Sequence, residues 1–145
     1  MIIGSLSENK EIEKRVSITP EIAKKYINLG FEIQLSENYG KHLGFEEKEY
    51  NEAGVKFVAD EKEIIKSADI IIQMGLLDEE KTSLLKTNQT FIGILNPYEN
   101  KIKLEELVKK KINLFSLELL PRITRAQSMD ILSSQANLAG YKAVI

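Results

Sequence analysis

Polar side chains concentrate near the carboxyl end of the chain, in residues 121–130 (PRITRAQSMD) and 132–141 (LSSQANLAGY). Burying so many polar groups is costly unless each finds a partner, so we expect this segment to face a ligand. The planar guanidinium of Arg122 could bind a carboxylate, a phosphate or an amide carbonyl. Gln127 offers both donors and an acceptor, whereas Asp130 only accepts. Together these three side chains could hold a polar heterocycle that carries a carboxamide and ribose hydroxyls.

The same segment has a plainer interpretation as the start of a helix. Thr124 or Ser128 would cap the helix, and Asp130 would lie in the first turn, where the helix dipole favours a negative charge. Judged on residue types alone, this plainer interpretation has more weight than ligand binding.

Three other places carry polar groups with two interpretations each. Ser134, Asn137 and Tyr141 share one helical face, which indicates contact with a cofactor or another subunit, or simply a solvated face. Arg15 precedes a capped helix and could reach a pocket, although a surface position is commoner for arginine. His42 is the one histidine and lies in a loop, and we assign it no role.

Composition excludes several classes of site. A chain of 145 residues, 43% apolar and 29% charged, is sufficient for one globular domain. A net charge of −2 argues against nucleic acid as the main partner. Without cysteine there are no disulfides, thiolate zinc sites or thiol nucleophiles, and one histidine cannot form a multi-histidine metal site. No segment approaches the roughly 20 apolar residues that span a bilayer, so we expect a soluble chain that does not insert into a membrane.

Strand and helix patterns alternate along the chain. We expect strands at residues 2–5, 31–35, 55–58, 70–74, 90–95 and 112–117, and helices at 20–29, 45–53, 60–67, 78–85, 101–111 and from 127 onward. This order predicts an α/β fold, a mostly parallel sheet flanked by helices that is Rossmann-like or flavodoxin-like. Ligands bind at the carboxyl edge of such sheets, and the loop at 119–125 follows the last strand there. The chain contains no G-x-G-x-x-G, so it lacks the glycine-fingerprint element that grips a dinucleotide pyrophosphate.

Residues 13–21 (EKRVSITPE), 121–130 and 132–144 closely resemble the alpha subunit of the proton-translocating NAD(P) transhydrogenases, and the spacing between them fits along the whole chain. The resemblance implies a soluble component that binds NAD(H) and passes hydride from NADH to NADP⁺ on a separate component, while a membrane component couples this to proton movement. It also implies that Arg122, Gln127 and Asp130 hold the nicotinamide and its ribose at the hydride-transfer face. Ser133 and Tyr141 match family positions close to the nucleotide.

The resemblance also carries expectations about partners and extent. It implies a homodimer that works with membrane and NADP-binding components, peripheral to the cytoplasmic side of the inner membrane if the protein is bacterial. Family members continue past residues 142–144 into a Rossmann domain with the glycine fingerprint. We therefore expect residues 1–125 to form an N-terminal α/β domain and residues 126–145 to begin the helix that leads to such a domain. A fragment, a truncated form or a split gene product would be inactive alone and bind NAD(H) weakly.

Two alternatives remain open from the sequence. The related alanine dehydrogenases share the Arg-Val-x-x-Thr-Pro pattern and use an Arg, a Lys and a His to bind and deprotonate an amino acid. Arg15 matches the Arg, but Gln73 and Asn96 stand where the Lys and His belong, and amides supply neither a cation nor a base. Transhydrogenases generally keep the Lys too, so Gln73 departs from both families. The other alternative is a non-catalytic, stand-alone domain.

Overall fold

Parallel strands build the centre of the computed structural model, which describes residues 1–121 and 123–144. The strands are β1 (Ile2–Ser5), β2 (Glu32–Ser36), β3 (Lys56–Val58), β4 (Ile70–Ile72), β5 (Thr90–Gly93) and β6 (Asn113–Ser116). Every neighbouring pair is parallel, in the order β3-β2-β1-β4-β5-β6. This is the strand order of doubly wound folds, so the predicted fold class is confirmed.

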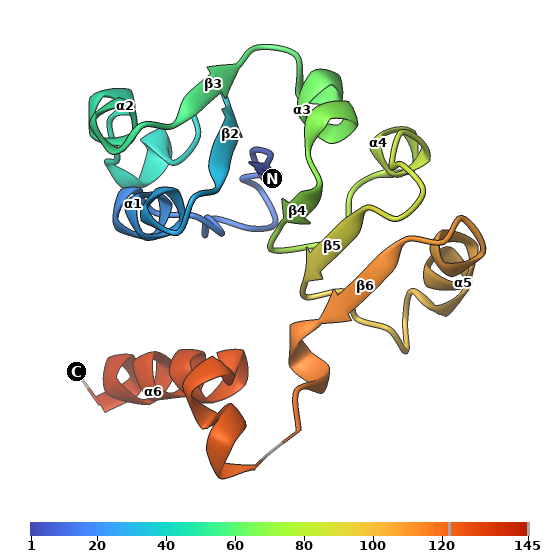
Figure 1. The fold of residues 1–145 in the computed structure, drawn as a ribbon. Coiled ribbons are helices and arrows are strands. Elements are labelled where there is room, and N and C mark those ends of the chain that lie inside the picture. Colours follow the sequence, from blue (N-terminus) through green and yellow to red (C-terminus); the bar gives the residue numbers. More distant parts are fainter. Residues whose placement is uncertain (122, 145) are drawn as a thin grey trace.

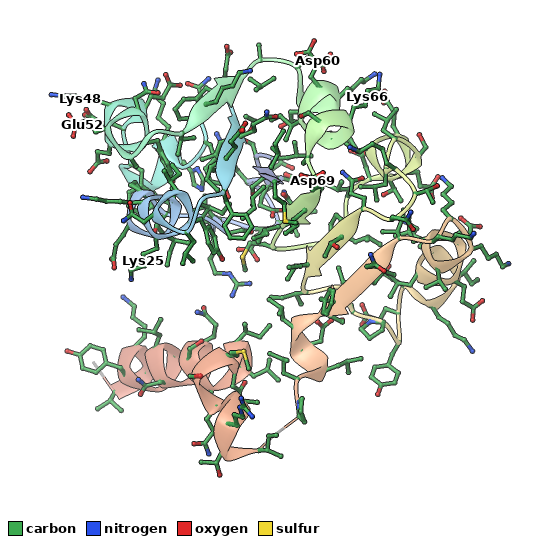
Figure 2. All side chains as sticks on the ribbon, in the orientation of Figure 1. Lys25, Lys48, Glu52, Asp60, Lys66 and Asp69 are labelled. Atoms are coloured by element: carbon green, nitrogen blue, oxygen red, sulfur yellow. The ribbon has the colours of Figure 1, made fainter. Side chains whose placement is uncertain are left out.

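Helices cover both faces of the sheet (Figure 1). They are α1 (Pro20–Asn28), α2 (Glu47–Ala53), α3 (Glu61–Ser67), α4 (Glu79–Ser83), α5 (Lys101–Lys109) and α6 (Ile131–Val144), with short 3₁₀ turns η1 (Lys41–Leu43), η2 (Leu117–Leu119) and η3 (Thr124–Met129). One apolar core lies between the sheet and α1 and α2, and a second lies between the sheet and α3, α4 and α5. Figure 2 shows that Lys25, Lys48 and Lys66 point from these helices into solvent. Both faces of the central strands are therefore buried, as parallel sheets require.

Side-chain caps fix where the helices begin. The Thr19 hydroxyl accepts from the Ile22 amide at 3.4 Å, and Pro20 occupies the first position of α1, both as predicted. Asp60 caps α3, again as predicted, and Asp78 caps α4 in the same way. These polar stops set the short loops that bring the carboxyl ends of the strands to one edge.

The last helix begins later than predicted. The sequence pattern predicts helix from residue 127 onward, but residues 127–129 belong to the 3₁₀ turn η3, and α6 starts at Ile131. The Asp130 carboxylate accepts from the amides of Leu132 (2.9 Å) and Ser133 (3.1 Å). Asp130 is thus the cap itself, because its side chain satisfies amides that the α-helix leaves without partners.

Gln73 joins the two halves of the sheet where the strand order reverses, between β1 and β4. Its side chain is buried, with 3% exposed. The amide oxygen accepts from the Leu6 amide at 3.0 Å, and the amide nitrogen donates to the Leu6 carbonyl at 2.9 Å. The side chain thus continues the pairing of β1 with β4 beyond the ends of both strands.

A buried tyrosine carries this contact to the segment before α1. The Tyr39 hydroxyl accepts from the amides of Ser17 (3.1 Å) and Ile18 (3.2 Å). It also lies 2.9 Å from the Ser5 hydroxyl, which donates to Gln73 at 3.4 Å. Burial raises the pKa of Tyr39, so the phenol stays protonated and its own proton goes to Ser5. The chain at Ser17 is therefore fixed to the carboxyl edge of the sheet.

Tyr39→Phe tests this network. The change leaves two buried amides and the Ser5 hydroxyl without their shared partner, and we expect a loss of about 1–3 kcal/mol in the free energy of unfolding, measured by urea denaturation. Tyr26→Phe is the matched control, because Tyr26 packs edge-on against Phe31 through its ring. We expect that control to cost less than about 0.5 kcal/mol. Equal losses in the two variants would contradict the network.

Gly93→Ala tests the close approach of β5 to the strand that carries Gln73. A Cβ at Gly93 would lie 2.5 Å from the backbone oxygen of Gln73, closer than the atoms allow. We expect the substitution to force β4 and β5 apart and to lower the free energy of unfolding by roughly 2 kcal/mol. Gly75→Ala is the control, because a Cβ there meets no atom within 4 Å. Thermal unfolding in which the control is less stable than Gly93→Ala would contradict the prediction.

Candidate functional site

The helix α6 lies across the carboxyl edge of the sheet, beyond the end of β6 (Figure 1). A cavity of about 540 Å³ separates it from the strands. Apolar side chains that follow the strands form one wall, among them Met74, Ile94 and Leu117, and α6 contributes Ile131, Ser134 and Gln135 to the other. The cavity occupies the edge where doubly wound sheets bind their ligands.

A second cavity of about 480 Å³ lies beside the start of α6 and collects most of the predicted site residues. Gln127, Asp130 and Ser133 line it, and Pro121, Ala126, Leu132 and Ala136 supply its apolar surface. The Ser133 hydroxyl donates to the Asp130 carboxylate at 2.6 Å. The pairing holds the carboxylate at the mouth of the cavity while it caps the helix.

Two predicted site residues are not in this group. Arg122 lies outside the described residues. Tyr141 is 71% exposed and lines neither cavity. It follows Ser133 by two turns of α6, about 12 Å along the helix axis, so one bound group the size of a nicotinamide cannot touch both.

Arg15 reaches the larger cavity from the loop before α1. Its guanidinium makes two parallel hydrogen bonds to the Glu13 carboxylate, 2.9 Å from Nε and 2.7 Å from Nη2. Its remaining nitrogen, Nη1, donates to Oε1 of Gln135 on α6 at 3.2 Å. The hydrogen bond from Arg15 lowers the pKa of Glu13 and raises that of Arg15, so both groups stay charged across the neutral range.

His42, a residue without an assigned role from its sequence context, fixes the same loop. Its Nε2 lies 2.6 Å from the carbonyl oxygen of Lys14. A carbonyl only accepts, so Nε2 carries the proton in this contact. The loop that presents Arg15 is thus held on one side by His42 and on the other by Tyr39.

Glu8 is a further residue at this edge that sequence reasoning did not single out. Its carboxylate accepts from the Met74 amide at 2.6 Å, and burial raises its pKa. Only its place after a strand could have drawn attention to it, because a Glu within a charged connection has no distinguishing pattern.

Gln73 and Asn96 stand where alanine dehydrogenases have a cation and a base. The Gln73 amide is satisfied by Leu6 and faces the sheet contact. The Asn96 backbone amide donates to the Glu118 carboxylate, and its φ of 46° places it in the left-handed region that asparagine tolerates. Neither side chain supplies acid–base chemistry in this arrangement. Within residues 1–121 and 123–144, every helix is too short or too polar to cross a membrane.

Comparison with known proteins agrees with this architecture. Residues 4–139 match the family described as alanine dehydrogenase/PNT, N-terminal domain. In Rickettsia prowazekii, the first of the polypeptides that make up the NAD(P) transhydrogenase alpha subunit is 38% identical over 149 residues, which cover all of this chain and 39% of that protein. The corresponding protein of Rhodospirillum rubrum is 38% identical over 150 residues, with the same coverage.

A solved structure gives the same result. The transhydrogenase from Sinorhizobium meliloti superimposes with a TM-score of 0.91 at 35% identity, over 99% of this chain and 43% of that one. An L-alanine dehydrogenase superimposes with a TM-score of 0.75 at 21% identity, over 81% of this chain and 32% of that one, which is a likeness of fold. This chain spans about 39% of the length of the curated transhydrogenase subunits it matches. The chain therefore belongs to the alanine dehydrogenase/PNT N-terminal domain family.

Proposed function

We propose that this chain is the N-terminal domain of a transhydrogenase alpha subunit, and that in the complete enzyme it helps to pass hydride from NADH to NADP⁺ held on a separate component. Proton translocation by a membrane component, a homodimeric state and a peripheral place on the cytoplasmic side of the membrane belong to the same proposal. The observation that supports it most is the grouping of Gln127, Asp130 and Ser133 around one cavity in a chain 38% identical to transhydrogenase subunits.

The residues around this cavity fit a nicotinamide riboside in chemical type. The Gln127 amide can donate to and accept from a carboxamide, and the Asp130 carboxylate can accept from ribose hydroxyls. Pro121, Ala126 and Ala136 give an apolar surface for a flat ring. When bound, NADH supplies the hydride; these side chains would orient the ring and exclude water. Arg122, Ser133 and Tyr141 would add contacts to the nucleotide, and residues 126–145 would lead into its main binding domain.

An amino-acid dehydrogenase is the less favoured alternative. The Gln73 amide is occupied by Leu6, so the position expected to bind and activate an amino acid holds the sheet together instead. An alanine dehydrogenase 1 from Staphylococcus aureus is 26% identical to this chain, compared with 38% for the transhydrogenase subunits. Oxidative deamination of alanine by the complete protein would reverse this preference.

Substitution of the cavity residues tests the proposal in the protein assembled with its nucleotide-binding and membrane components. Gln127→Ala and Asp130→Asn should slow hydride transfer by about 10²-fold or more while the affinity for NADH changes by less than about threefold, because orientation is lost and most binding contacts remain. Asparagine keeps the capping oxygen of Asp130 and removes its charge.

Ser128→Ala is the matched control, since Ser128 is exposed beside the cavity and does not line it. Stopped-flow transfer rates and calorimetric titration measure the two quantities. If rate and affinity fall equally, the segment binds the nucleotide without aiming it, and the proposed role is wrong.

The 145-residue chain alone should bind NADH only weakly. It has no glycine turn for the pyrophosphate, so we expect a Kd on the order of millimolar. Calorimetric titration with NADH checks this value. Micromolar affinity would mean that the chain holds a complete dinucleotide site of another kind.

A further inference from the structure

The attachment of α6 to the rest of the domain depends little on apolar packing. Among the described residues of α6, none is buried, and Leu132 and Leu138 remain 49% and 62% exposed. The helix packs against η2 at its start and has few other neighbours. An isolated helix of 14 residues is marginal in water, so polar contacts weigh more here than in a core helix.

One hydrogen bond joins a side chain of α6 to the segment before α1 in the described parts of the chain. It runs from Arg15 Nη1 to Gln135 Oε1, across the larger cavity. Both ends of the loop that carries Arg15 are fixed, because His42 holds the Lys14 carbonyl and Tyr39 holds the Ser17 amide. The donor therefore has a defined position relative to the sheet.

Glu13 fixes the direction of the Arg15 guanidinium. The two parallel bonds at 2.9 and 2.7 Å leave only rotation of the whole ion pair, and the Glu13 carboxylate also accepts from the Arg15 amide at 2.8 Å. Bidentate pairs of this kind add geometric specificity as well as energy. With Nε and Nη2 occupied by Glu13, the nitrogen left over is the one that contacts α6.

We propose that Arg15, oriented by Glu13, is a positioning residue that sets where α6 lies across the carboxyl edge. Asp130 caps this helix and lines the adjacent cavity, so a shift of α6 moves the Asp130 carboxylate with it. The consequence for hydride transfer rests on the proposed function; the contact between Arg15 and α6 does not. In this arrangement the carboxylate of Glu13 occupies the fork of Arg15 and repels any anion that approaches it.

A double-mutant cycle on the 145-residue chain, without nucleotide, tests the contact. Arg15→Met and Gln135→Leu should each speed amide exchange in residues 131–144 by about three- to tenfold, as loss of one partly exposed hydrogen bond predicts. The double variant should exchange no faster than either single one, because both remove the same bond. Thermal unfolding of the sheet should stay unchanged, since Arg15 is exposed and outside both cores.

Asn137→Leu is the matched control on the same helix, and it should leave exchange unchanged. Leucine favours helix more than either amide does, so its intrinsic effect opposes the expected loss of protection. Unchanged exchange in Arg15→Met, or additive effects in the double variant, would overturn the proposal.

Kinetics of the assembled protein separate this inference from the proposed function. Arg15→Met should lower kcat for hydride transfer several-fold with KM for NADH unchanged, and Arg15→Lys should not restore it, because an ammonium cannot make the two parallel bonds. If Gln127→Ala slows transfer while Arg15→Met does not, the positioning role is wrong and the proposed function stands. If exchange is coupled but Gln127→Ala leaves transfer unaffected, the proposed function is wrong and Arg15 still positions α6.

Discussion

The paired hydrogen bonds between the Gln73 side chain and the backbone of Leu6 are the contact on which the rest of the architecture depends. They lie where the strand order reverses, the place at which two neighbouring parallel strands would otherwise diverge and leave backbone groups without partners. Closing that gap with a buried amide keeps β1 and β4 together up to the carboxyl edge. The Ser5 and Tyr39 hydroxyls then extend the same network to the loop that presents Arg15.

This continuity links the sheet to the candidate site. The strands fix Gln73, the network fixes Ser17, and the fixed loop holds Arg15 beside Gln135 of α6. The start of the same helix carries Asp130 and Ser133 at their cavity. The polar segment near the end of the chain thus depends on contacts made by residues far earlier in the sequence. Belonging to the alanine dehydrogenase/PNT N-terminal domain family is consistent with such a division between a rigid sheet and a helix at its edge.

Much of the fold could be predicted because the signals are local. Alternating apolar stretches indicated the strands, and Thr19, Pro20 and Asp60 marked helix starts through hydrogen bonds within three residues. The predicted start of α6 was wrong because Asp130 competes with Thr124 and Ser128 as a cap, and residue type alone does not rank them. The parts played by His42, Glu13 and Tyr39 depend on partners brought close by the tertiary fold. Tyr141 is grouped with Ser133 by resemblance, but helix geometry separates them.

The chemical nature of Gln73 has one more consequence. An amide neither gains nor loses a proton in water near neutrality, so the bond between the two halves of the sheet is indifferent to acid and base. A lysine there would bring a charge that needs a counter-ion, and a histidine would change its donors as it titrates. Any acid sensitivity of this edge must therefore arise from its charged neighbours. Glu8 is one of them, since its carboxylate holds Met74 and burial raises its pKa, so that it takes up a proton in weaker acid than an ordinary carboxylate does.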